Sequence, residues 1–117
     1  MSKPHETGKK GEEEALVFFT KLGYKLVAKN WRFAKAEVDL IVENEDWIVF
    51  VEVKTRTNDS HGSPESFVSR AQQKHLIRAA NHFADTHPSE KQYRFDVISI
   101  LLEPQFQLKH IPEAFYP

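Results

Sequence analysis

Cysteine is absent from this chain of 117 residues, and its absence excludes several kinds of site at once. Without a thiol, the chain can form neither a disulfide, nor a cysteine nucleophile, nor a cysteine-ligated zinc centre. Any metal ion must therefore be held by oxygen atoms or by imidazole nitrogens.

Long hydrophobic runs are also missing. No stretch approaches the roughly 18 consecutive apolar residues that a membrane span requires. The polar start MSKPHETGKKGEEE lacks the apolar segment that a signal peptide carries. We therefore expect a cytoplasmic protein without a membrane segment.

The chain has no marked excess of charge. Its 16 Lys and Arg and 17 Asp and Glu give a formal net charge of −1, which is not typical of a dedicated nucleic-acid-binding protein. The charges are nevertheless uneven, because bases crowd residues 21–35 while acids cluster at 12–14, 43–46 and 103–113. A local basic surface is therefore compatible with the sequence.

The apolar pattern predicts one α/β domain over residues 1–117, with residues 1–7 as a flexible N-terminus. Helical spacing covers about residues 6–22 and 66–86, and strands are expected at 24–33, on either side of the polar residues 43–46, at 93–102 and at 105–111. The predicted order is therefore helix, three strands, helix, two strands. Each helix has one apolar stripe, so a mixed central sheet flanked by the two helices is the expected architecture.

Residues 35–56, KAEVDLIVENEDWIVFVEVKTR, predict an antiparallel hairpin that carries charge where apolar residues belong. Successive side chains alternate between the faces of a strand, so Glu52 and Lys54 share one face. A loop with an even number of residues brings Asp39 to that face. Asp39 lies directly opposite Glu52 if four residues form the turn and diagonally if two do, within roughly 5 to 8 Å in either register.

Two carboxyl groups this close raise each other's pKa unless a cation lies between them. Mg²⁺ or Mn²⁺ would be such a cation, because both prefer oxygen ligands and keep water molecules that a neighbouring group can orient. Lys54 is placed to orient that water or to stabilise charge on a phosphate. The structural alternative is that Glu52 and Lys54 form an ordinary ion pair while backbone amides satisfy Asp39.

Glu12 is a third acid that could approach the same face of the sheet. It precedes Leu16 by four residues and Phe19 by seven, so it falls on the apolar stripe of the first helix. Alternatively, Glu12 interacts with the positive end of its helix from a solvated first turn.

Six short segments make the sequence resemble the YraN family of bacterial proteins. They are GKKGEEEA (8–15), KNWR (29–32), AEVDLI (36–41), FVEVKTR (50–56), RFDV (94–97) and HIPEAF (110–115). That family is placed in the PD-(D/E)XK nuclease superfamily and is similar to archaeal Holliday junction resolvases. The resemblance implies a restriction-endonuclease-like fold and a metal-dependent DNA endonuclease, with branched or structured DNA as a candidate substrate and a homodimer as a candidate assembly.

The resemblance also implies roles for individual residues. Catalysis is assigned to Glu12, Asp39, Glu52 and Lys54. Asp39, Glu52 and the backbone carbonyl of Val53 are expected to bind Mg²⁺ or Mn²⁺, with Glu12 completing or extending this shell. Lys54 is expected to orient the attacking water.

Two positions depart from the family's pattern. Ala36 stands where glycine is common, and if that glycine has a positive φ, alanine costs about 1 kcal/mol. Gln72-Gln73 stands where the family usually has a Lys-Gln pair. The sequence does not determine whether Gln72 keeps the polar contact that this lysine would make from the second helix.

Four side chains are expected to contact nucleic acid, namely Arg32, Arg56, Gln73 and Lys74. Lys74 recurs with Arg70 and Arg78 at four-residue steps, a spacing typical either of a stripe that follows phosphates or of an ordinary solvated helix face. The steps between His75, His82 and His87 do not converge three imidazoles on one point, so a zinc site is not predicted.

Arg94 and Asp96 are expected to form an ion pair that tethers the edge of the sheet. The rival to the endonuclease is a non-catalytic module of the same fold that binds nucleic acid or another protein. The small net charge favours this rival, whereas the intact set of acids with Lys54 favours the enzyme.

Overall fold

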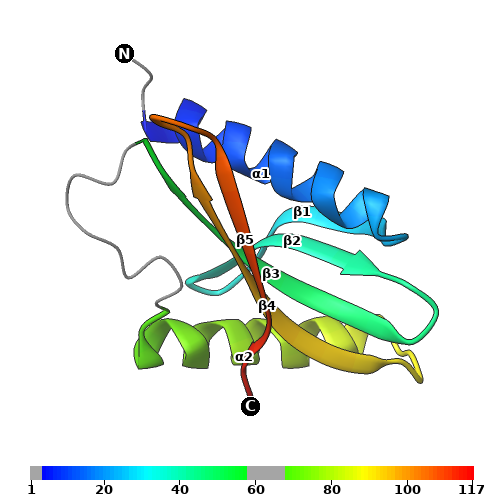
Figure 1. Cartoon of the computed structure of the whole chain (residues 1–117). Helices are drawn as coiled ribbons and strands as arrows, with labels where there is room; N and C mark the ends of the chain where they lie inside the picture. The colour runs from blue at the N-terminus through cyan, green and yellow to red at the C-terminus, as the bar shows by residue number, and fades with distance from the viewer. Residues whose placement is uncertain (1–3, 58–67) are drawn as a thin grey trace.

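A computed structural model describes residues 4–57 and 68–117, of which residues 4–7 are described by their backbone alone. The elements along the chain are α1 (Pro4–Lys21), β1 (Lys25–Phe33), β2 (Ala36–Glu43), β3 (Trp47–Arg56), α2 (Arg70–Thr86), β4 (Gln92–Leu101) and β5 (Gln107–Phe115) (Figure 1). The predicted order of helices and strands is confirmed.

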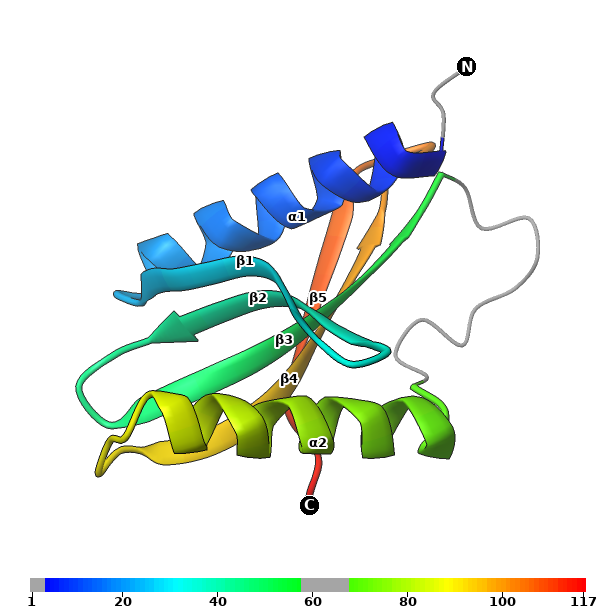
Figure 2. The same cartoon turned by 180° about the vertical axis from the view of Figure 1, so that it is seen from behind.

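The five strands form one mixed sheet in the order β1-β2-β3-β4-β5. Strands β3 and β4 run parallel, and the other neighbouring pairs run antiparallel. Helix α1 covers one face of the sheet and α2 covers the other, as both views show (Figures 1 and 2). The predicted mixed α/β architecture is therefore confirmed. Among the described residues, no helix is long and apolar enough to cross a membrane.

Strand β3 lies in the middle of the sheet and contributes to two hydrophobic cores. Val49 and Val51 pack with Phe19 on the α1 side, whereas Phe50 packs with Phe83 on the α2 side. Burial of both faces explains the nearly continuous apolar run that precedes Glu52, and it fixes the direction in which each charged side chain points.

The helix starts differ from their predicted positions. Helix α1 begins at Pro4, where proline is tolerated because the first turn has no intrahelical N–H bond to lose. Of residues 1–7, predicted to be flexible, residues 4–7 therefore belong to α1, and residues 1–3 lie outside the described residues.

Helix α2 begins at Arg70, because Ser69 is extended and its side chain caps the helix by accepting a bond from the Gln72 N–H (3.1 Å). Predicted helix residues 66 and 67 also lie outside the described residues.

Strand β5 is longer than predicted, since it continues past Ile111 to Phe115. Pro112 does not end it, because β5 is an edge strand and an edge position tolerates a missing N–H donor. This extension brings the HIPEAF segment alongside β4.

Helix α1 approaches β3 closely at Gly11. A Cβ added at this glycine would overlap the side chain of Thr55. The next residue, Glu12, is thereby held near the end of β3 that carries the predicted site residues.

The tip of the β1–β2 hairpin rests on α2. Phe33 pairs with Ala36, which leaves a turn of two residues, and the ring of Phe33 stacks on His82 of α2 with centroids 4.0 Å apart. The left-handed conformation in this turn belongs to Ala34 (φ 56°) and not to Ala36. The cost of a positive φ, expected at Ala36, therefore does not arise there but at Ala34. Ala36 itself is buried in the core beside α2.

Candidate active site

The β2–β3 pairing sets the position of the two central carboxylates. Glu43 pairs with Ile48, so the turn has four residues, and the described pairing ends with Leu40 and Val51. Asp39 and Glu52 are the next residues beyond this last pair, and both line the same pocket, where they share a hydrogen bond. The two acids therefore lie where the backbone ladder between these strands stops.

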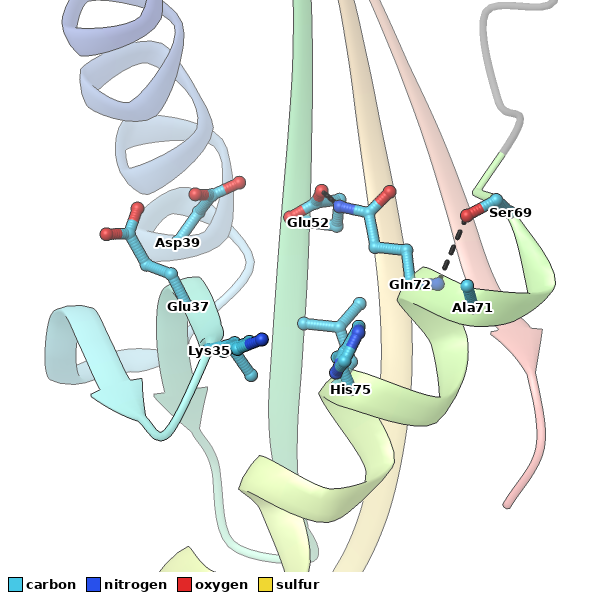
Figure 3. A pocket seen from close by; sticks show the side chains of 10 residues that line it. Lys35, Glu37, Asp39, Glu52, Ser69, Ala71, Gln72 and His75 are labelled. Atoms are coloured by element: carbon cyan, nitrogen blue, oxygen red, sulfur yellow. Dashed lines mark hydrogen bonds between the residues drawn. The ribbon is translucent and has the colours of Figure 1, made fainter.

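A pocket of about 470 Å³ opens at this point, between the two strands and the first turns of α2 (Figure 3). Its lining comprises Lys35, Ala36, Glu37, Asp39, Glu52, Ser69, Ala71, Gln72, His75 and Leu76. The pocket thus combines three carboxyl groups with two basic side chains and the N-terminal end of a helix.

Asp39 is the most strongly perturbed acid of the pocket. Burial, together with the charge of Glu52 and a hydrogen bond shared with it, raises the pKa of Asp39 to about 9, and the more distant charge of Glu12 adds to the rise. The Val53 N–H, which donates to Asp39 Oδ2 (2.8 Å), opposes it only partly. Without a cation, Asp39 therefore holds a proton near neutral pH.

Glu52 has a different set of partners. Its side chain is buried, and Oε2 lies 3.4 Å from Lys54 Nζ. The Gln72 side chain bridges the two residues, because its Nε2 donates to Glu52 Oε2 and its Oε1 accepts from Lys54 Nζ (3.3 Å). Sequence reasoning did not assign Gln72 to the site, and the departure from the family's lysine was the one signal that could have found it.

Both features of the structural alternative are present. Glu52 and Lys54 are paired, and a backbone amide binds Asp39. These two contacts do not keep both acids ionised, however. The Val53 N–H lowers the pKa of Asp39, but burial and Glu52 raise it by more. Strongly perturbed pKa values of this kind cluster at functional sites, so the raised pKa of Asp39 marks the pocket as a candidate functional site.

Glu12 lies near the acid pair without lining the pocket. It is the ninth residue of α1, so the alternative that placed it in a solvated first turn is wrong. Its Oε1 accepts a bond from Asn30 Nδ2 of β1 (3.0 Å), and its charge reaches Asp39 as the weakest of the influences that raise that pKa. Among the described residues, no three histidine, cysteine, aspartate or glutamate side chains gather closely enough to hold a metal ion together.

The residues predicted to contact nucleic acid do not belong to the described lining of the pocket. Within the described lining, none of Arg32, Arg56, Gln73 and Lys74 appears. Arg32 is exposed and its Nε pairs with Glu37 Oε2 (2.7 Å), whereas the Gln73 amide donates to the Val68 carbonyl (2.9 Å). Arg56 ends β3, and Lys74 is exposed on α2.

The three histidines of α2 and its C-terminal cap do not meet. His82 stacks on Phe33, His87 stacks on Phe83 with centroids 4.2 Å apart, and His75 faces the pocket. The three rings therefore have separate neighbours.

A further buried acid, Asp96, lies outside the pocket. It accepts bonds from Arg94 Nε (2.7 Å), Arg94 Nη2 (2.8 Å), His110 Nε2 (2.7 Å) and the Glu113 N–H (3.1 Å). Burial alone would raise the pKa of Asp96, but the bonds from His110 and Arg94, the Arg94 charge and the Glu113 N–H together lower it. The predicted Arg94–Asp96 pair is confirmed. Its predicted location was wrong, because β4 lies inside the sheet and not at its edge.

Comparison with known proteins identifies the family. The profile of the uncharacterised protein family UPF0102 matches residues 11–100. A UPF0102 protein of Flavobacterium psychrophilum is 38% identical over 99% of this chain and 98% of its own length. One from Chloroherpeton thalassium is 44% identical over 82% of this chain and 75% of its own length. The chain therefore belongs to the UPF0102 family, the YraN family that its sequence resembles.

Proposed function

We propose that the pocket is the active site of a divalent-metal-dependent DNA endonuclease. The observation that carries this proposal is the paired placement of Asp39 and Glu52, with the Asp39 pKa raised to about 9 and Lys54 beside the pair. A structural carboxylate normally has partners that keep it ionised, whereas this pair needs a cation to lose its shared proton.

The donor set fits Mg²⁺ or Mn²⁺. These ions are commonly bound through one or two carboxylates, with water and substrate phosphate as the remaining ligands, so a cluster of three acids is not required. Asp39 and Glu52 would supply the carboxylates. The Val53 carbonyl is the third predicted ligand, because the N–H and C=O of one strand residue point toward the same neighbour and its N–H already meets Asp39.

Each side chain then has a defined task. A bound Mg²⁺ or Mn²⁺ would polarise the scissile phosphate and promote ionisation of a water molecule. Lys54 orients the attacking water or stabilises negative charge on the phosphate, while Gln72 holds its ammonium group near Glu52. Glu12 acts on the pair from a distance through its charge. The oxygen of water adds to phosphorus while this water releases a proton to solvent, the bond from phosphorus to the leaving oxygen breaks, and the leaving oxygen takes up a proton from solvent.

A panel of substrates tests the proposed reaction. The protein is incubated in Mn²⁺ with linear duplex, single-stranded, flapped and four-way DNA. Strand scission of at least one substrate is expected, and it should be lost in Asp39→Ala and Glu52→Ala. A four-way junction has two scissile strands, so preference for it should coincide with a symmetric dimer in a sedimentation measurement.

The rival is a non-catalytic module of the same fold that binds nucleic acid or another protein. The formal net charge of −1 favours it, since the proposed enzyme has no overall basic excess to attract DNA. Binding without scission of every substrate in the panel would support this rival and overturn the endonuclease.

A further inference from the structure

Two basic side chains of the pocket have no partner among the residues that the structure describes. Lys35 and His75 both line it, and neither forms an ion pair or hydrogen bond with any described residue. Figure 3 shows them on the same side of the pocket, with Lys35 coming from the β1–β2 turn and His75 from α2. Both are exposed and accessible from solvent.

The acids of the same pocket do not use these two groups. Glu37 pairs with Arg32, Glu52 is bound by Gln72 and Lys54, and Asp39 accepts the Val53 N–H. The ammonium of Lys35 is therefore not consumed in neutralising the carboxylates. The His75 imidazole keeps a hydrogen-bond donor in either protonation state. Together they leave one half of an otherwise acidic pocket suited to an anion.

The fold holds Lys35 in this position at a cost. Its turn has only two residues, and Ala34 takes a left-handed conformation that alanine rarely adopts. Phe33, at the base of the turn, is stacked on His82, so the hairpin tip is fixed against the helix that presents His75. A positive φ is what a two-residue hairpin turn requires, so this turn has one defined shape that carries Lys35.

We propose that Lys35 and His75 form a subsite for a phosphate adjacent to the scissile one. This inference rests on the proposed function and deepens it, because the substrate must then be a strand with at least two successive phosphates. The acid pair receives the phosphate that reacts, and Lys35 with His75 holds its neighbour on the same strand. The double contact fixes the strand across the pocket and sets which bond faces Lys54.

The test is a binding measurement that does not depend on cutting. Fluorescence anisotropy in Ca²⁺ compares the wild-type protein, the double variant Lys35→Gln/His75→Gln, and the control Lys21→Gln, an exposed lysine at the end of α1. The double variant should bind a labelled single strand roughly tenfold more weakly. The slope of log affinity against log salt should fall by about 0.7 for the phosphate that Lys35 no longer neutralises.

A scan with neutral methylphosphonates locates the contact. Oligonucleotides that carry one methylphosphonate, moved along the strand a position at a time, should show one position that weakens wild-type binding and has no further effect in the double variant. Unchanged affinity and salt slope, or the same scan profile in both proteins, overturns the subsite. Unfolding midpoints equal to wild type confirm that the exposed substitutions leave the fold intact.

The two proposals can fail separately. Scission that is lost in Asp39→Ala while Lys35→Gln/His75→Gln binds like wild type supports the endonuclease and overturns the subsite. A methylphosphonate effect removed by the double variant, with no scission of any substrate, supports the subsite as a phosphate-binding site and overturns the endonuclease.

Discussion

Asp39 and Asp96 are two acids of the same sheet whose pKa values are shifted in opposite directions. Asp96 is fully buried, yet two donors from Arg94, the His110 ring and the Glu113 N–H hold its pKa below the usual range. Asp39 meets one backbone N–H and a second carboxyl group, and its pKa rises to about 9. The Asp96 carboxylate thus has enough donors to stay ionised, whereas Asp39 has too few to offset its burial and the neighbouring carboxyl group.

The largest expected effect comes from removing the charge of Asp96. Asp96→Asn leaves the Arg94 guanidinium with 12% of its side chain exposed and no carboxylate partner among the described residues. Breaking a buried pair in this way costs about 3 to 5 kcal/mol of unfolding free energy. Urea unfolding at pH 7 measures it.

Asp39→Asn is the matched control for that experiment. Near neutral pH an amide resembles the protonated Asp39 carboxyl group, and it removes the cost of keeping that proton in the folded state. Asp39→Asn should therefore stabilise the metal-free protein at pH 7. Equal destabilisation by both variants would contradict the distinction between the two acids.

The pH dependence of stability should show the same contrast. Asp39 ionises near pH 3.8 in the unfolded chain and near pH 9 in the folded protein, so between these values the unfolded chain binds fewer protons. The stability of the metal-free protein should fall as the pH rises through this window, by at most about 1.4 kcal/mol per pH unit. Asp96, whose pKa is lowered, should contribute stability that is lost as the pH falls below 3.8.

Urea unfolding at several pH values measures both effects. In Asp39→Asn the fall between pH 4 and pH 9 should become shallower, while the loss in acid should remain. A profile that is unchanged by this substitution would mean that another group is responsible.

The sequence could predict the pairing of acids but not their surroundings. Alternation along β3 is enough to place Glu52 and Lys54 on one face. In β2, however, Val38 packs in the core that contains Ile41 and not in the one that contains Leu40, so the alternation breaks at Asp39. The length of the turn between the strands is likewise given only by the structure. The contact between Gln72 and Glu52 depends on where α2 begins. The helix was predicted from residue 66, but it begins at Arg70 because Ser69 caps it.

The surroundings of Asp96 were harder to predict for a similar reason. Arg94 is two residues away on the same strand, so its pairing follows from alternation. His110 and Glu113 reach Asp96 only because β5 continues through Pro112 and pairs with β4 across a register shift. A register shift between two strands leaves no regular pattern in the sequence. RFDV and HIPEAF are nevertheless both among the six segments by which the sequence resembles the family.

A smaller effect is expected at Gln72, whose side-chain amide bridges Glu52 and Lys54. Gln72→Met keeps the side-chain length but removes the amide, so Glu52 loses a competing donor and Lys54 loses an acceptor. Mn²⁺ should bind several-fold more tightly, while single-turnover cleavage slows. Calorimetry and quenched-flow measurements test the two effects.

Gln73→Met is the matched control for Gln72, because its amide donates to the Val68 carbonyl and lies outside the pocket lining. Its metal affinity should equal that of wild type. If both variants change the affinity alike, the effect arises from α2 as a whole and not from the bridge to Glu52.

The smallest effect is expected at Thr55, whose Oγ1 is a buried side-chain atom without a hydrogen-bond partner in the described part of the chain. Thr55→Val keeps the shape that packs on Gly11 and removes the unsatisfied hydroxyl. The unfolding free energy should rise by about 1 kcal/mol. A lower value in urea unfolding would show that the hydroxyl contributes to stability.

Calorimetric titration with Mn²⁺ at pH 8, with and without DNA, tests the central claim about Asp39 and Glu52 most directly. Because the pair must lose its shared proton, we predict binding whose heat varies with the ionisation enthalpy of the buffer and corresponds to about one proton released. Asp39→Ala and Glu52→Ala should abolish it. The absence of Mn²⁺ and Mg²⁺ binding by the wild-type protein, both alone and with DNA, would contradict the account.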